Sequence, residues 1–268
     1  MPTPKSEADR ALADFWRSYV ESGRGGFGYV VRDPLAALRA LRAVQKLPVV
    51  YPPDLSDTPG GREVQRVLNQ KGPGGLPARW WSLAALPVPD SPQDSLKNPE
   101  AKRLRYHLRW AEKENVTCRP VHPGERAGLL ERANAREIMH TDPTYRIANP
   151  RNDDLLEHDL WFVAQDDDAG EPLMLAVAAV DGELSVLRYF RTLGDSERHT
   201  LSRYPTHMAL VEALAERRVR WLLDTEPPAA QTNGVRLFQR NLGFRHVRIR
   251  RPGIGGQMNR ATGFLALG

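Results

Sequence analysis

The sequence contains a single cysteine, Cys118, among its 268 residues. One cysteine excludes an internal disulfide and a zinc site built from several cysteine ligands. Because it follows a polar stretch and precedes an arginine, we interpret it as a structural thiol rather than a nucleophile. No apolar run approaches the roughly 20 residues that cross a bilayer, and the charged N-terminus lacks the apolar core of a signal peptide. We therefore expect a cytoplasmic protein with no membrane span.

The motifs of several common enzyme classes are also absent. The seven histidines offer no H-E-x-x-H or comparable spacing, so we predict no metal site. Neither a G-x-S-x-G nucleophile elbow nor a P-loop is present, and hydrolase and NTPase functions therefore lack support. The segment GRGGFG at 23–28 matches G-x-G-x-x-G, but it follows an expected helix and enters an expected strand. A dinucleotide fingerprint needs the reverse order, so we interpret this segment as a loop.

Lysine is scarce, and the charges are unevenly distributed. The chain has 6 lysines against 32 arginines, with a formal net charge of +5. After Glu226 no acidic residue follows, whereas seven arginines do, and a second basic block lies at 97–113. This asymmetry favours a polyanionic partner, either RNA or a nucleotide cofactor. A solvated arginine-rich surface, as a GC-rich genome would produce, is the alternative.

Periodicity and turn signals predict a mixed series of helices and strands. The segment 87–99 carries four prolines and is interpreted as a linker, and turn signals at 166–170 and 181–182 predict an antiparallel meander over 160–190. The helices are expected at 6–22, 34–45, 62–70, 99–115, 123–140, 208–217 and 235–241. The strands are expected at 27–31, 47–51, 80–86, 116–121, 160–165, 172–180, 184–190, 219–223, 244–250 and 261–267.

The most informative segment is 219–250. An apolar strand ends at Asp224, a proline-broken loop follows, and a short amphipathic helix runs into LFQRNLGF, Leu237–Phe244. This order resembles the C-terminal end of the GNAT acyltransferase fold, in which the equivalent helix ends in lYeklGF. The resemblance implies that strands 184–190 and 219–223 splay apart and hold the acyl donor between them. It also implies that the intervening helix, expected to open at Tyr204-Pro205-Thr206, holds an anion at its N-terminus.

Two departures from the usual GNAT pattern point to one branch of it. The loop that normally reads Q/R-x-x-G-x-G/A has no glycine between Asp195 and Leu210, and Phe238 stands where the family often has a tyrosine general acid. Both features resemble the Fem-type N-acyltransferases, which use aminoacyl-tRNA. Their basic helix resembles RYHLRWAEKENV at 105–116, and their next helix resembles YPTHMALVEALAERRVRWLLDTE at 204–226. The resemblance covers roughly residues 97–250.

The resemblance implies an α/β (α+β) fold, with a mixed, mostly antiparallel twisted sheet flanked by helices, GNAT-like, and a reduced N-terminal second lobe. We expect the N-terminal lobe at 1–96, as a degenerate GNAT-like half, and the acyltransferase domain at 97–268. A single GNAT domain with an N-terminal extension is the alternative.

The implied function is that of an N-acyltransferase forming an amide bond on an amine acceptor. The donor would be an aminoacyl-tRNA that acts as co-substrate, with no tightly bound cofactor, so the expected partners are tRNA and a small-molecule or peptide amine. Two alternatives remain open. One is an acyl-CoA-dependent N-acetyltransferase with a degenerate cofactor loop, and the other is a non-catalytic RNA-binding GNAT-like module.

Amide formation needs a base for the ammonium proton and a donor for the developing oxyanion. Asp224 and Glu226 are the candidate bases because they lie at the mouth of the splayed strands, although a strand-end turn or helix cap explains them too. Tyr204 and His207 flank the expected helix opening and are candidates for the acid.

The remaining candidates are binding residues. The expected donor contacts are Arg188, Tyr189, Thr206, Arg236 and Arg240, and the expected acceptor contacts are His140, Asp142 and Tyr145. Only one of the neighbours Arg188 and Tyr189 should face the cleft, since side chains alternate along a strand. Arg236 and Arg240 lie four residues apart on one helical face. Phosphate binding and a solvated surface are the two alternative explanations of this spacing.

Overall fold

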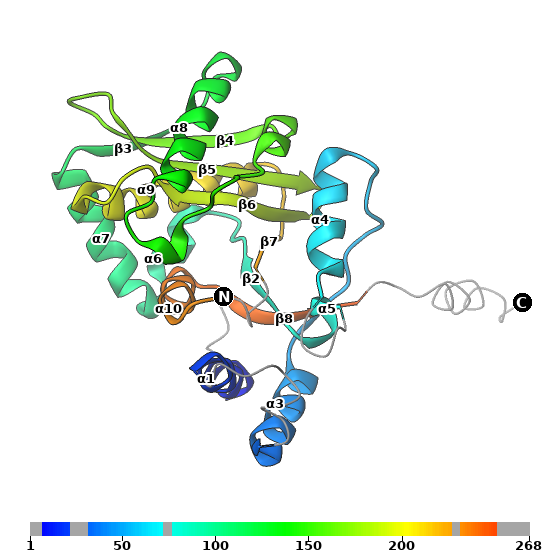
Figure 1. Cartoon of the computed structure of the whole chain (residues 1–268). Coiled ribbons are helices and arrows are strands. Elements are labelled where there is room, and N and C mark those ends of the chain that lie inside the picture. The colour runs from blue at the N-terminus through cyan, green and yellow to red at the C-terminus, as the bar shows by residue number, and fades with distance from the viewer. Residues whose placement is uncertain (1–6, 22–31, 72–76, 227–230, 251–268) are drawn as a thin grey trace, which may run out of the picture.

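Eight strands form one mixed sheet in the computed structural model, which describes residues 7–21, 32–71, 77–226 and 231–250 (Figure 1). The strand order is β1-β8-β2-β7-β6-β5-β4-β3. The strands are β1 (Val49–Val50), β2 (Leu83–Pro87), β3 (Val116–Pro120), β4 (Leu160–Asp166), β5 (Pro172–Asp181), β6 (Leu184–Thr192), β7 (Trp221–Asp224) and β8 (Arg245–Ile249). Only β1–β8 and β6–β7 pair in parallel, so the predicted mixed, mostly antiparallel sheet is confirmed.

The helices begin and end at residues suited to those positions. Asp33, Thr58, Ser196 and Thr232 each accept a hydrogen bond from the N–H group three residues further on, as N-cap side chains do. The helices are α1 (Glu7–Glu21), α3 (Pro34–Lys46), α4 (Pro59–Asn69), α5 (Ala78–Trp81), α6 (Pro92–Lys97), α7 (Lys102–Lys113), α8 (Arg126–Ile138), α9 (Glu197–Glu216) and α10 (Asn233–Leu242). No helix in the described ranges combines the length and apolarity needed to cross a membrane.

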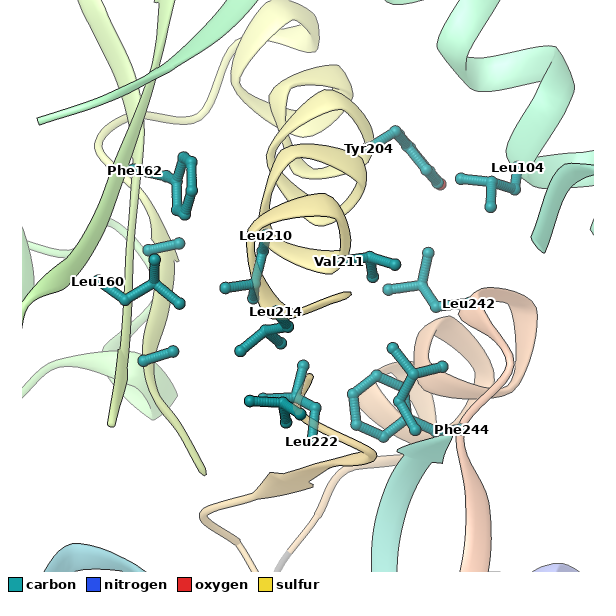
Figure 2. Close-up of a cluster of buried hydrophobic side chains, with 14 of the residues drawn as sticks. Leu104, Leu160, Phe162, Tyr204, Leu210, Val211, Leu214, Leu222, Leu242 and Phe244 are labelled. Carbon is teal, nitrogen blue, oxygen red and sulfur yellow. The ribbon is translucent and has the colours of Figure 1, made fainter. Parts of the chain in front are cut away.

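Helices cover both faces of the sheet, because the side chains of its central strands are apolar in both directions. On one face, α9 packs against alternate residues of β4 and β5, such as Phe162 and Ala176, and α7 and α10 complete this cluster with Leu104 and Leu242. Figure 2 shows Leu210 and Leu214 of α9 between the sheet and Phe244. On the other face, α8 packs against Trp161, and α4 packs against β5, β6 and β8. The sheet is therefore the middle layer of three.

Strands β4, β5 and β6 form the predicted antiparallel meander. Gly170 and Gly182 lie in its two turns with φ of +66° and +56°, a backbone region that favours glycine. The pairing of β5 with β6 shifts between Val177 and Ala178, which face Tyr189 and Leu187 respectively. The shift leaves one extra residue in β6, so the strand carries a β-bulge and bends there.

Strands β6 and β7 diverge immediately next to this bulge. They pair in parallel from Leu184 with Trp221 to Leu187 with Asp224. Beyond that point β6 continues to Thr192 with no β7 partner in the described part of the chain. We call this point the β6–β7 fork. It is the splayed pair of strands that the GNAT resemblance implies, with α9 connecting the two strands.

The N-terminal segment contributes to the same sheet. Strand β2 lies between β7 and β8, pairing Ala85 with Leu223 on one side and Leu83 with Val247 on the other. Strand β1 adds a parallel edge to β8. By contrast, α1 and α3 pack mainly against each other. The residues on both sides of the expected boundary at 96/97 therefore contribute strands to the same sheet.

Several predicted boundaries are wrong. The helix expected at 208–217 is α9, which begins at Glu197 and contains Pro205 in its interior. The linker expected at 87–99 contains α6. The strand expected at 80–86 begins only at Leu83, after the short helix α5. The strands expected at 27–31 and 261–267 and most of the GRGGFG segment lie outside the described residues.

Candidate active site

Asp224 is the titratable residue that the fold places at the β6–β7 fork. Its Oδ1 accepts a hydrogen bond of 2.8 Å from the backbone N–H of Glu226, and its Oδ2 accepts one from Gln239 Nε2 on α10. Since Leu222 packs on the α9 side and Leu223 on the α4 side, alternation puts the Asp224 side chain on the α9 and α10 side. Burial raises the pKa of this carboxyl to about 7, a value suited to a general base near neutral pH.

Glu226, the second candidate base, has a different environment. Its side chain is exposed, and its backbone N–H serves to hold Asp224. The two carboxylates therefore lie in different environments. Of the two, it is Asp224 whose pKa is raised by burial. The hydrogen bond across two residues is also an Asx-type turn, so the structural explanation of Asp224 as a strand-end turn and its candidacy as a base both fit the geometry.

An aromatic group lies between α7, α9 and α10 on this side of the sheet. Tyr204 stacks on His107 with ring centroids 4.3 Å apart, and it meets Phe238 edge-on at 5.8 Å. Phe190, from the part of β6 beyond its pairing with β7, lies 6.2 Å from Phe238, and the guanidinium of Arg203 lies 5.8 Å from the same ring. Tyr204 thus brings a phenol next to Phe238, which stands at the position of the tyrosine in the lYeklGF pattern that the segment resembles. Burial raises the pKa of Tyr204, which keeps the phenol protonated near neutral pH.

Thr206 and His207 lie in the middle of α9, so the expected helix opening at 204–206 is wrong. The Thr206 hydroxyl is fully buried and donates a 2.7 Å hydrogen bond to Ser202 O. His207 is buried, its Nε2 has no hydrogen-bond partner among the described residues, and burial lowers its pKa to about 4. It is therefore neutral near pH 7. Both side chains face the core rather than an open surface.

The true N-terminus of α9 carries charges of both signs and is already capped. Glu197 lies in its first turn, Ser196 caps it, and Asp195 precedes the cap. Asp195 accepts hydrogen bonds from Arg136 and, at 2.9 Å, from Thr141. A GNAT pyrophosphate would need free N–H groups and positive potential at such a position. Here the Ser196 side chain already accepts from His199 N and Glu197 adds a negative charge, while Asp195 is paired with Arg136, so the capped turn is a poor site for a pyrophosphate.

The bulge in β6 places Arg188 and Tyr189 on the same side of the sheet, contrary to the expected alternation. Arg188 forms two hydrogen bonds with Asp154, of 2.7 and 2.8 Å, and lies 3.6 Å from Glu63 of α4. Tyr189 is buried in the core beneath α8, and burial together with the charge of Glu137 raises its pKa. Both expected donor contacts are thus engaged in a polar network on the α4 and α8 side.

The expected acceptor residues come together in one turn after α8. His140 Nδ1 accepts a 3.1 Å hydrogen bond from Asp142 N, and the His140 and Tyr145 rings lie 5.4 Å apart. Thr141, inside this turn, binds Asp195, so the turn lies against the segment that joins β6 to α9. These side chains are largely exposed, with Tyr145 at 43%, and are open to an acceptor.

Arg236 and Arg240 line a cleft of about 600 Å³ between α10 and α1. Gln239 lines it too, and the same side chain binds Asp224. Sequence reasoning identified the two arginines but missed Gln239, Gln231 and Arg17. Asp224 and Gln239 are 15 residues apart, and this spacing matches no helix or strand period, so it does not predict their contact. The segment LFQRNLGF does predict the helix that carries Gln239.

The single cysteine has the structural role that the sequence predicts. Cys118 packs against the core on the α9 side, and burial raises the pKa of its thiol to about 12, which keeps it protonated and unreactive. Among the described residues, no group of three or more histidine, cysteine, aspartate or glutamate side chains is arranged to hold a metal ion.

The described residues form a mixed α/β fold whose sheet opens at the β6–β7 fork. No protein-family model and no curated protein matches the sequence. Among solved structures, the chain is similar to FemX, with 11% identity, a TM-score of 0.46, and 64% of this chain and 60% of that chain covered. It is also similar to the C-terminal domain (DUF2156) of a putative lysylphosphatidylglycerol synthetase from Agrobacterium fabrum, with 13% identity, a TM-score of 0.45 and coverage of 62% and 58%.

A third similar structure is L-PGS from Bacillus licheniformis, with 11% identity, a TM-score of 0.43 and coverage of 62% of this chain and 57% of that one. The chain therefore spans less than two thirds of the length of each of these three structures.

Proposed function

We propose that the protein is an N-acyltransferase that uses an aminoacyl-tRNA to form an amide bond on an amine acceptor. The observation that carries the proposal is Asp224, a carboxyl with a pKa of about 7 at the fork of two splayed strands. An amine can attack an acyl ester only after losing its proton, and a base with a pKa near the working pH takes it most efficiently.

The proposed chemistry is an aminolysis of the ester. The amine nitrogen attacks the acyl carbon, Asp224 takes the ammonium proton, and a C–N bond forms. The bond between the acyl carbon and the ribose oxygen then breaks, and that oxygen takes a proton. Tyr204 is our candidate for the proton donor, because it is a protonated phenol in contact with Phe238. Since the ester is already activated, positioning of the two substrates contributes much of the rate.

The choice of donor rests on charge. The N-terminus of α9 is already capped by Ser196 and has Glu197 in its first turn, which makes it a poor site for the pyrophosphate of an acyl-CoA. Positive charge is concentrated instead along α10 and β8, where no acidic residue follows Glu226. A polyphosphate chain such as tRNA fits this distribution.

The exposed turn with His140, Asp142 and Tyr145 is the proposed acceptor contact. Residues 1–96 are the proposed second lobe.

The test is a parallel titration of the purified protein with acetyl-CoA and with bulk aminoacylated tRNA at 50 and 200 mM salt, followed by an assay of acyl release from tRNA with added amines. We expect tRNA binding that weakens steeply with salt, no acetyl-CoA binding, and amine-dependent acyl release. Binding of acetyl-CoA without tRNA would establish the acyl-CoA alternative. Binding of tRNA with no acyl release under any amine would indicate a non-catalytic RNA-binding module.

A further inference from the structure

The cleft between α1 and α10 is large enough to hold a small ligand. Its volume is about 600 Å³, within the range of about 300–1,000 Å³ that is usual for ligand pockets. Figure 1 shows α1 and α10 next to each other beside one end of β8. A hydrogen bond of 3.2 Å from Asn233 on α10 to Glu21 on α1 joins the two helices. The cleft is therefore built from segments more than 200 residues apart in sequence.

Positive charge dominates the lining. Four arginines line the cleft, Arg17 from α1, Arg236 and Arg240 from α10, and Arg245 at the start of β8, against the single carboxylate of Asp14. That carboxylate pairs with Arg17 at 3.0 Å. Arg236 donates a 2.7 Å hydrogen bond to Asn233 Oδ1. Burial lowers its pKa, as does the charge of Arg17, while the charge of Glu21 opposes the shift. The Arg17 and Arg236 guanidinium groups therefore repel each other, and Glu21 partly offsets this. An anion between them would relieve this repulsion.

The first turn of α10 adds to the positive potential. This helix has ten residues, begins at Asn233 and is capped by Thr232, whose hydroxyl accepts from Val235 N at 3.3 Å. Asn233 and Arg236 of this turn line the cleft. The N-terminal end of a helix dipole favours negative charge, so this turn adds to the positive potential of the arginines.

The rest of the lining suits a flat, partly polar group. Ala84 of β2, Leu237 of α10 and Phe244 supply apolar contact area. Gln231 is only 1% exposed, and its Oε1 has no hydrogen-bond partner in the described part of the chain, while its Nε2 donates to Glu226 O at 3.1 Å. A buried acceptor without a partner is costly, so a ligand that donates an N–H or O–H there would be favoured.

We propose that this cleft binds one nucleotide, with its phosphate at Arg236, Arg240 and Arg17 and its base on the apolar floor beside Gln231. The same chemistry occurs at the single-stranded 3′ end of an RNA and in the nucleotide part of coenzyme A. Assignment of the cleft to the 3′-terminal nucleotide of a tRNA rests on the proposed function. Gln239 lines the cleft and binds Asp224, so an occupant of the cleft lies one side chain away from the candidate base.

The experiment measures binding of three probes to the full-length protein: AMP, coenzyme A and a 12-nucleotide RNA that ends in CCA. Arg236→Ala with Arg240→Ala should weaken AMP and RNA binding at least tenfold and should flatten the salt dependence of RNA binding. Arg132→Ala with Arg217→Ala is the matched control, because it removes two exposed arginines outside the cleft. The control should bind each probe within twofold of the wild type. Ala13→Trp should block AMP by filling the cleft without a change of charge.

The possible results distinguish a failure of the cleft proposal from a failure of the proposed function. The cleft proposal is overturned if the wild type binds none of the probes, or if the cleft variants bind them as the control does. Tight RNA binding with weak coenzyme A binding supports a nucleotide cleft and an RNA source. Tight coenzyme A binding without RNA supports the cleft but removes aminoacyl-tRNA as donor. RNA binding that depends on the cleft, together with no acyl release in the transfer assay, supports the cleft and contradicts the catalytic proposal alone.

Discussion

The side-chain amide of Gln239 donates a hydrogen bond to Asp224 Oδ2, and this bond joins the end of β7 to the middle of α10. It fixes the orientation of a carboxyl whose pKa is about 7. The same amide lines the arginine-rich cleft. Gln239 of α10 therefore holds Asp224 at the β6–β7 fork and also connects it to the cleft.

Asp224→Asn should lower kcat for acyl transfer by about 10²–10⁴-fold, the range that a general base contributes. In the wild type, activity should rise with pH and level off above about 7, because the base must be ionised. The measurement is a pH–rate profile of both proteins. Glu226→Gln is the control, and it should stay within about threefold of the wild type since its side chain is exposed. Equal activity of the asparagine variant and the wild type would remove Asp224 as the base.

The same substitution has a separate effect on stability. The Asp224 pKa is raised from an unfolded value of about 3.9 to about 7 in the fold, so the folded state holds the proton more tightly. Its stabilising contribution is complete below pH 4 and is lost as pH rises to 7, by at most about 1.4 kcal/mol per pH unit. Asp224→Asn should lack this component. Urea unfolding at pH 5 and pH 8 should therefore show a smaller loss of stability in the variant, and an identical loss in both proteins would contradict the raised pKa.

Tyr204→Phe should keep the ring contacts with His107 and Phe238 but lower kcat by about 10²-fold, because it removes the proposed proton donor. Phe238→Tyr added to this variant should restore at least tenfold of the loss, since it returns a phenol to the adjacent ring position. Thermal unfolding should confirm that all three proteins are folded. A fully active Tyr204→Phe enzyme would place the acid elsewhere.

Arg188→Ala should destabilise the fold by about 1.5–3 kcal/mol, because it removes the charged hydrogen bonds to Asp154, while Glu63 keeps its pair with Arg66. The matched control is Arg220→Ala, whose partner Glu183 is half exposed and whose loss should cost less than about 1 kcal/mol. Urea denaturation measures both free energies of unfolding. Equal losses would mean that the network around Arg188 contributes no more than a surface pair.

Gly60→Ala should destabilise the protein by about 1–3 kcal/mol through overpacking. A Cβ atom at this position would lie 2.1 Å from Val180 O, so α4 would have to move away from β5. Gly128→Ala on α8 is the control, because a Cβ there meets nothing within 4 Å and alanine favours helix by about 0.5–1 kcal/mol over glycine. The two variants should therefore shift the urea midpoint in opposite directions.

Local patterns in the sequence predicted the elements near the fork well. Alternation and turn residues identified β4, β5 and β6, and the LGF segment marked the end of α10, where Gly243 has φ +98°. The predicted start of α9 is wrong because Pro205 resembles a helix opening, whereas the Ser196 cap lies nine residues earlier. A proline inside a helix is unusual, and tertiary packing of α9 against the sheet outweighs its cost here.

Features that depend on distant parts of the chain were not predictable from one sequence. The place of β2 between β7 and β8 is decided by pairing across about 140 residues, such as Ala85 with Leu223, and local propensity carries no information on it. The bulge at Arg188 puts that residue and Tyr189 on the same side of the sheet, whereas alternation along a strand predicts opposite sides. The contact of Asp224 with Gln239 depends on how α10 docks, which the spacing of the two residues does not specify.

The position of β2 also has a consequence for the order in which the molecule is assembled on the ribosome. Its two neighbours, β7 and β8, are synthesised more than 130 residues later, so β2 emerges as an apolar segment with no strand to pair with. The β3–β6 meander can form from local contacts while synthesis continues. The centre of the sheet, and with it the β6–β7 fork, closes only when β7 and β8 have left the exit tunnel.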